Sequence, residues 1–132
     1  MIEIENEIYS GLSTLLKTSD PTISTGNMYV NTKKNKPFVS LEEIDQYNDS
    51  NSEDSSHTEK YAFTVFEANI YTDGHMRKSK AKKILTVVDD YIRGLGFERL
   101  SMTPMQSNNE VSYRIVARYR GLVSKNKIIY RR

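Results

Sequence analysis

One amphipathic helix constrains the fold of this chain more than any other feature. Between Lys80 and Leu95, apolar residues recur at the i, i+3, i+4 spacing that places them on one face of an α-helix. These residues are Ala81, Ile84, Leu85, Val88, Ile92 and Leu95. The opposite face is polar and charged along its length, so the helix buries only one stripe. A stripe of this kind needs a flat partner, and we expect that partner to be a sheet.

Strand-like segments rich in β-branched and aromatic residues lie on both sides of this helix. Tyr61–Thr72 precedes it, and Phe97–Met105 and Glu110–Arg120 follow it. Apolar residues occupy both alternating faces of Tyr61–Tyr71, which predicts a central strand covered on both sides. The glycines of Gly94-Leu95-Gly96 predict a tight helix end before the next strand.

The N-terminal part predicts a second helix and then a hairpin. Apolar residues at helical spacing indicate a helix over Glu3–Lys17, and they are Ile4, Ile8, Leu12, Leu15 and Leu16. This helix must end by Asp20-Pro21, because proline disfavours a helical residue before it. Met28–Val30 and Pro37–Leu41 are predicted to pair as a short hairpin around a basic turn.

These elements predict one α/β (α+β) domain over residues 1–132. Its core is a mixed or antiparallel sheet of about four to five strands with two main helices packed on it. The stretch Asp45–Lys60 is predicted to be a loop, and its segment Asn48–Glu59 is polar enough to be flexible.

Composition excludes several classes of function. The net charge of +2 is too small to indicate a nucleic-acid binder by itself. The sequence has no cysteine, which excludes disulfides, thiol catalysis and thiolate metal sites. It has neither an apolar run of membrane-spanning length nor a secretory leader pattern, so we expect no membrane association. The apolar share of 37% is low for a self-sufficient domain and indicates that a partner shares in its burial.

The segment Glu110–Arg120 has two chemically different faces. One set of alternating residues is apolar and is predicted to face the core. The other set presents three guanidinium groups, those of Arg114, Arg118 and Arg120. Three interpretations of this row remain open: a solvated strand face, a salt-bridge surface between subunits, or a lining that faces passing DNA.

A second basic cluster crowds the start of the main helix. Its members are Arg77, Lys78, Lys80, Lys82 and Lys83. Positive charge at this end opposes the helix dipole and costs about a few tenths of a kcal/mol per residue. The placement indicates a partner, and a tolerated run of exposed charge is the alternative.

Catalytic and metal-binding patterns are weak. The two histidines have no second histidine or cysteine at ligand spacing. For Glu67, in the predicted central strand, pairing with an arginine of a neighbouring strand is favoured over a role as general acid or base. Asp89 and Asp90 point about 100° apart on their helix, so Asp89 suits an i, i+4 pair with Arg93 better than a metal clamp. We therefore predict no enzyme activity, no cofactor and no metal.

The tyrosines and the C-terminal tail provide the remaining apolar surface of the chain. Tyr61, Tyr71, Tyr113 and Tyr119 are interpreted as core or interface residues rather than as base-stacking platforms. The tail from Gly121 to Arg132 is apolar enough to dock but leaves little chain to bury it, so we expect it to pair on a neighbouring subunit.

Several segments occur in an order that matches one known family. They are Pro37-Phe38-Val39, Phe66 to Thr72, the amphipathic helix ending on Gly94-Leu95-Gly96-Phe97-Glu98-Arg99, Tyr113 to Gly121, and Ile128 to Arg132. In order and spacing they resemble the tail-terminator (neck-terminator, tail-completion) proteins of tailed bacteriophages. The likeness extends from Pro37 to the end and includes the opening helix, and the polar loop Asn48–Glu59 departs from it.

The resemblance implies a structural role in virion assembly. Proteins of this family form a hexameric ring that ends growth of the tail tube and joins the tail to the head or neck. The implied location is the tail–neck junction of the virion, after assembly in the host cytoplasm. The implied partners are the tail tube protein and the head–neck connector proteins, with DNA passing through the lumen without sequence-specific binding.

The residues predicted to form the subunit or partner interface are Arg114, Arg118, Arg120, Arg77, Lys78, Lys82 and Tyr130. The alternative function is a small nucleic-acid-binding module that uses the basic strand face on phosphates.

Overall fold

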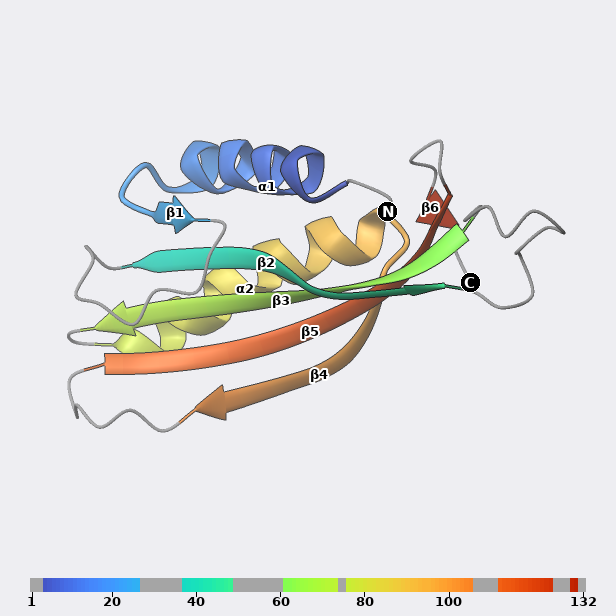
Figure 1. The fold of residues 1–132 in the computed structure, drawn as a ribbon. Helices are drawn as coiled ribbons and strands as arrows, with labels where there is room; N and C mark the ends of the chain where they lie inside the picture. Colours follow the sequence, from blue (N-terminus) through green and yellow to red (C-terminus); the bar gives the residue numbers. More distant parts are fainter. Residues whose placement is uncertain are drawn as a thin grey trace, which may run out of the picture.

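Two helices and a mixed sheet form two layers (Figure 1). The computed structural model describes residues 4–26, 37–48, 61–73, 76–105, 112–124 and 129–130. Along the chain the elements are α1 (Glu5–Ser19), β1 (Ser24–Gly26), β2 (Phe38–Asn48), β3 (Tyr61–Asp73), α2 (Arg77–Gly94), β4 (Glu98–Met105), β5 (Ser112–Ser124) and β6 (Ile129–Tyr130).

The strand order in the sheet is β1-β2-β3-β5-β4, with β6 paired to β5. β1 and β2 are parallel, and every other described pairing is antiparallel. This arrangement confirms the predicted α+β fold with a mixed sheet and two main helices. β3 lies between β2 and β5, which confirms that Tyr61–Tyr71 belongs to a central strand.

Helix α2 confirms the apolar stripe. The residues predicted for it and found buried are Ala81, Ile84, Leu85, Val88 and Ile92, and Leu95 packs partly buried at the edge of the core. The helix ends as predicted. Gly96 has φ 114°, a value that favours glycine, and its N–H donates to the carbonyl of Arg93 at 3.0 Å.

Helix α1 buries a narrower stripe than the sequence predicts. Ile8, Leu12 and Leu16 are buried, and Ile4 just before the helix is buried as well. Leu15 is 40% exposed, so its predicted place on the stripe is wrong. It lies one residue, or about 100° of helical rotation, from Leu16 and therefore points away from the sheet.

Both helices contribute to one core on a single face of the sheet (Figure 1). β3 supplies Ala62, Phe66, Ala68 and Ile70 to this core. Phe66 meets Phe97 edge-on, with ring centroids 5.6 Å apart and planes at 82°. The Phe97 ring lies against Gly121 of β5, where a Cβ would fall 2.5 Å from the Phe97 Cδ1 atom.

The opposite face of the sheet, here called the open face, is covered by no helix among the described elements. β3 is nevertheless buried or half-buried on both faces, as its pattern predicts. On the open face, Val65 and Asn69 of β3 are only 8% and 1% exposed. The open face is thus partly buried although none of the described helices lies over it.

β2 is much longer than its predicted form. The strand continues through Asp45–Asn48, which the sequence assigns to a loop, because β3 pairs with it along this whole length. One register shift, at Ile44, interrupts the pairing. Polar residues are tolerated here because one face of the strand is open. Met28–Val30, the predicted partner of Pro37–Leu41, lies outside the described residues, as do residues 49–60 of the predicted loop.

The start of the C-terminal tail pairs within its own chain, contrary to the expectation that it pairs on a neighbour. Residues Leu122–Ser124 continue β5 and pair with β3, and β6 pairs back on Leu122 and Val123. Val123 is fully buried. The strand continues through Gly121 because β3 pairs with it there, and the missing side chain of Gly121 makes room for Phe97.

Candidate interaction surfaces

The cross-strand register places the three predicted arginines of β5 on the open face. The facing residues on β3 give the pairs Arg114–Tyr71, Arg118–Glu67 and Arg120–Val65. The alternating residues Ile115, Ala117 and Tyr119 belong to the core on the helix side. The two-faced pattern predicted for this strand is therefore confirmed.

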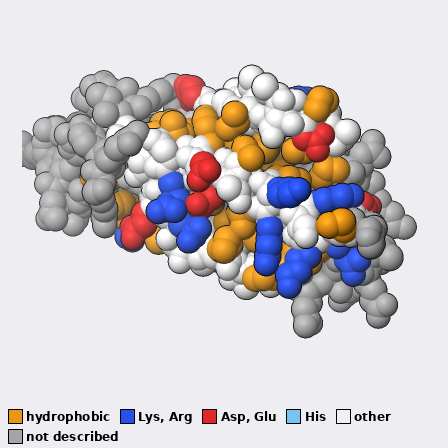
Figure 2. All heavy atoms as spheres, turned by 180° about the vertical axis from the view of Figure 1, so that it is seen from behind, with side chains coloured by type: hydrophobic (Ala, Val, Ile, Leu, Met, Phe, Trp, Pro, Cys, Tyr) orange, Lys and Arg blue, Asp and Glu red, His pale blue; other side chains and the backbone are white. Residues whose placement is uncertain are grey.

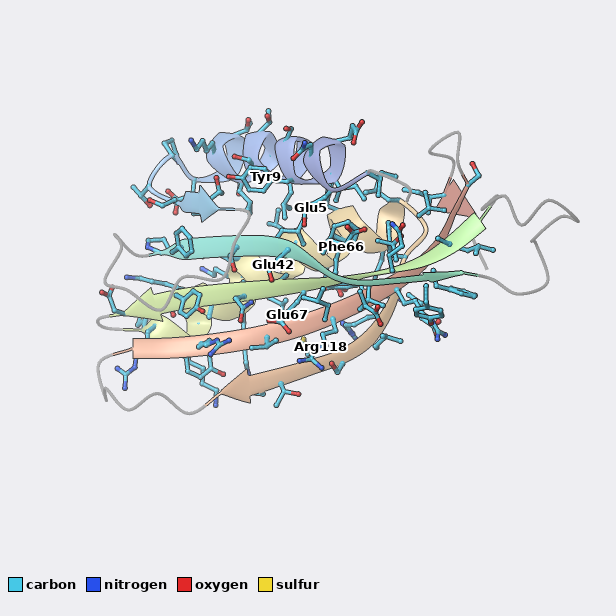
Figure 3. The ribbon with its side chains drawn as sticks, in the orientation of Figure 1. Glu5, Tyr9, Glu42, Phe66, Glu67 and Arg118 are labelled. Atoms are coloured by element: carbon cyan, nitrogen blue, oxygen red, sulfur yellow. The ribbon has the colours of Figure 1, made fainter. Side chains whose placement is uncertain are left out.

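Arg118 forms an ion pair with Glu67, as Figure 3 shows along the row from β2 to β5. The Arg118 Nε atom donates to Glu67 Oε2 at 3.0 Å, and the arginine side chain is 53% exposed against 16% for the glutamate. Glu42 of β2 faces Glu67 from the other side. Two carboxylates directly opposite each other repel, and the Arg118 charge offsets this repulsion. The structural arginine partner predicted for Glu67 is thus confirmed.

Arg114 is bound to the middle of β3. Its Nε and Nη2 atoms donate to the Asn69 side-chain oxygen at 3.0 and 2.7 Å. The guanidinium also stacks over Tyr71, 5.4 Å from the ring centroid. Asn69 in turn donates to Glu67 at 3.1 Å. The buried Asn69 amide therefore links Arg114 of β5 to Glu67 of β3 on the open face.

Arg120 completes the row beside an aromatic pair. Its Nη2 atom lies 3.4 Å from Glu98 of β4, and its Nη1 atom donates to the Tyr47 hydroxyl at 3.4 Å. The guanidinium lies 5.3 Å from the centre of the Phe63 ring. Phe63 stacks on Tyr47 at 5.2 Å. All three arginines therefore have partners inside the subunit, and the open face carries paired charges of both signs.

The second predicted cluster lies at the start of α2, on the helix side of the molecule. The lysines of this cluster are exposed and form no ion pair with any described residue; they are Lys78, Lys80, Lys82 and Lys83, here called the α2 lysine surface. Arg77 is half-buried. Figure 2 shows basic side chains gathered around apolar ones on this face.

The helix start has no built-in compensation for this charge. Met76 precedes α2 in the left-handed conformation, with φ 61°, and gives no side-chain cap. The first turn contains no acidic residue. The positive end of the helix dipole and the lysines therefore add to one electropositive surface.

Two apolar grooves flank the α2 lysine surface. The first, about 360 Å³, lies between α1 and α2 and is lined by Leu16, Ile23, Ile84 and Val87 with Lys80 and Lys83 at its rim. The second, about 400 Å³, lies between α2 and β4 and is lined by Leu85, Met102, Pro104 and Ile115 with Lys82 and Arg99 beside them. Each groove thus combines apolar walls with cationic side chains.

A buried carboxylate joins α2 to β4 and β5. Asp89 is only 8% exposed, and it accepts hydrogen bonds from the Tyr119 hydroxyl at 2.9 Å, from Arg99 at 3.2 Å and from Arg93 at 3.4 Å. Burial, and then the hydrogen bond with Asp89, raise the pKa of Tyr119 above its ordinary value. The predicted Asp89–Arg93 pair is confirmed, but the sequence did not indicate Tyr119 or Arg99 as partners. The only local signal was the place of Asp89 on the buried stripe, four residues after Leu85.

Other predicted site residues fall at separate places. Tyr130 belongs to β6, whose backbone pairs with Leu122 of the same chain. The histidines, His57 and His75, lie outside the described residues. Among the residues that the structure describes, no group of three or more histidine, cysteine, aspartate or glutamate side chains is placed to hold a metal ion.

Comparison of the sequence with models of known protein families and with characterised proteins found no match. Within the described part of the chain, neither helix is long and apolar enough to span a membrane. The two surfaces are therefore interpreted from their own geometry.

Proposed function

We propose that this protein is a structural assembly subunit of the tail-terminator kind. In this role it forms a homo-oligomeric ring that ends growth of a phage tail tube and joins the tail to the head or neck. The proposal combines the sequence resemblance with one structural observation, the open face. That face is half-buried and ordered by cross-strand ion pairs, yet no described element covers it.

The chemistry of the open face favours a protein partner over nucleic acid. Arg114, Arg118 and Arg120 are each held by a carboxylate, an amide or an aromatic ring of their own subunit. A phosphate backbone is best neutralised by cations free to approach it. A face of alternating paired charges and half-buried aromatic rings instead suits another protein surface, where such groups set register and partner choice.

The α2 lysine surface is the specific observation that favours the alternative, a nucleic-acid-binding module. Its four lysines form no ion pair with described residues, and they are adjacent along one helix. If these lysines bind phosphates, the affinity falls steeply as salt rises, with a slope set by the number of phosphates contacted.

The test is the oligomeric state of the purified full-length chain and its effect on tubes. Mass photometry and electron micrographs are expected to show a ring, hexameric by the family resemblance. When the chain is added to the tail tube protein encoded in the same genome, tubes are expected to stop at a defined length. A chain that stays monomeric at every concentration, leaves tube length unchanged and binds DNA in a salt-sensitive manner would refute the proposal.

A further inference from the structure

Helices α1 and α2 run in opposite directions on the same face of the sheet (Figure 1) and touch closely toward one end of the pair. There the Tyr91 hydroxyl donates to the Ile8 carbonyl at 3.4 Å and leaves no room for a Cβ on Gly11. The apolar groove of about 360 Å³ lies toward the other end, between the last turn of α1 and the first turns of α2. It is called the α1–α2 groove.

The walls of the α1–α2 groove are apolar and fixed in place. Leu16 of α1 and Ile23, just before β1, line one side, and Ile84 and Val87 of α2 line the other. The first three belong to the buried core, and Val87 packs partly buried against it. Because close-packed core residues hold these walls, the groove is already formed before a partner arrives. An apolar side chain that entered it would extend the core.

Lysines dominate the charge at the rim of this groove. Lys80 and Lys83 line it from α2, and both side chains are exposed and form no ion pair with any described residue. Asp20 is the one carboxylate among the described lining residues. It already accepts hydrogen bonds from the backbone N–H and the hydroxyl of Thr22, at 3.0 and 2.7 Å. The rim therefore keeps a net positive charge.

An apolar centre inside a charged rim is the arrangement of a protein–protein contact. Carboxylates of a partner complement the two lysines, and apolar side chains of the same partner fill the space between the walls. Nucleic acid fits less well, because its phosphates pair with lysines but leave apolar walls uncovered. A groove between two helices also accepts a third helix, whose apolar stripe packs along it.

We propose that the α1–α2 groove binds an acidic amphipathic helix of a partner protein. The apolar stripe of that helix enters between Leu16 and Val87, and carboxylates beside the stripe pair with Lys80 and Lys83. Lys82 lies at the other groove, between α2 and β4, and takes no part in this contact. The inference does not depend on the proposed ring, because a single subunit carries the whole groove.

Fluorescence anisotropy with a synthetic peptide tests the docking on the full-length chain. The probe is a fluorescein-labelled peptide of leucine, glutamate and alanine, with its leucines at the i, i+3, i+4, i+7 spacing of one helical face. A scrambled peptide of the same composition has the same charge but no apolar stripe. At physiological ionic strength, where charges more than about 8 Å apart are largely screened, the probe is expected to bind at least about tenfold more tightly than the scrambled peptide.

Matched variants locate the contact. Lys80→Glu with Lys83→Glu is expected to weaken binding of the probe at least about tenfold, because both rim attractions become repulsions. Lys78→Glu with Lys82→Glu makes the same change in net charge on the same helix, and its expected effect is within about threefold of wild type because these charges are screened. Val87→Arg adds a positive charge but fills the groove, and it is also expected to weaken binding at least about tenfold.

Circular dichroism establishes that each variant is folded, and the two lysine pairs decide the question alone if Val87→Arg is not. Equal weakening by both lysine pairs, or unchanged binding to folded Val87→Arg, overturns the docking, because either result means that charge alone holds the probe. A wild-type chain that does not bind the probe at up to about 1 mM peptide overturns it as well. If the chain shows no preference for the probe over the scrambled peptide, and both lysine pairs weaken binding of duplex DNA, the lysines are assigned to nucleic acid instead. Ring formation is measured separately by mass photometry, so each of these failures leaves the proposed function standing.

Discussion

Replacement of Asp89 by alanine should destabilise the fold far more than the same change at the neighbouring Asp90. Asp89 accepts a hydrogen bond from the Tyr119 hydroxyl inside the core, with the two oxygens 2.9 Å apart. Removal of the carboxylate leaves that hydroxyl buried without its acceptor, at a cost of about 1–3 kcal/mol. The lost pairs with Arg93 and Arg99 add about 1 kcal/mol or less, because these side chains are 57% and 37% exposed and are hydrated once free.

Two effects reduce this cost. Alanine is the better helix former by about 0.5 kcal/mol, and the buried charge no longer needs to be desolvated. The net expectation is a loss of about 2 kcal/mol in the free energy of unfolding. At roughly 4 °C per kcal/mol for a chain of this size, the Tm of Asp89→Ala should fall by about 8 °C.

The assay is urea unfolding followed by circular dichroism, with thermal melts of the same samples. Asp90→Ala is the matched control, because it makes the same change on the same helix at an exposed position. Its expected effect is within about 0.5 kcal/mol of wild type. A double-mutant cycle of Asp89→Ala with Tyr119→Phe should give a coupling energy of about 1–2 kcal/mol. Equal stabilities for Asp89→Ala and Asp90→Ala, or no coupling in the cycle, would refute the account.

Two further predictions concern the same core. The raised pKa of Tyr119 means that the folded state keeps a proton that the unfolded state loses. Its contribution to stability is therefore complete below the unfolded pKa of about 10 and is lost as pH rises above it, so urea unfolding between pH 8 and 11 should show a shallower decline for Tyr119→Phe than for wild type. Gly121→Ala should cost about 1–3 kcal/mol in the same assay, because the new Cβ meets the Phe97 ring at 2.5 Å. Gly94→Ala, where nothing lies within 4 Å of the new Cβ, should be tolerated, and equal costs at the two glycines would contradict this packing.

The sequence alone determined the features that depend on a regular short spacing of apolar residues along the chain. The α2 stripe follows from the spacing of Ala81, Ile84, Leu85 and Val88, because a period of 3.6 residues puts them on one face whatever they pack against. The two faces of β5 follow in the same way from a period of two. Helix ends at Pro21 and Gly96 follow from backbone restrictions of single residues.

The candidate surfaces were predictable only in part. Alternation put the three arginines on one face, and proximity in sequence put the lysines on one helix. The partners of the arginines depend on register, however, since Glu67 lies 51 residues from Arg118 in the chain. The sequence could name an arginine as the partner of Glu67 but not decide which one.

Only the tertiary structure decided how far β2 and β5 extend and which face of β3 stays open. Glu42, Glu43 and Asp45 have no strand-like pattern of their own, and they become a strand because β3 supplies backbone partners along them. β5 continues past Gly121 because β3 pairs with it, and Phe97 fills the space above the glycine. Asp89 is buried because Tyr119 and two arginines converge on it from other elements. These outcomes depend on contacts between residues far apart in the chain, and a local sequence pattern does not specify such contacts.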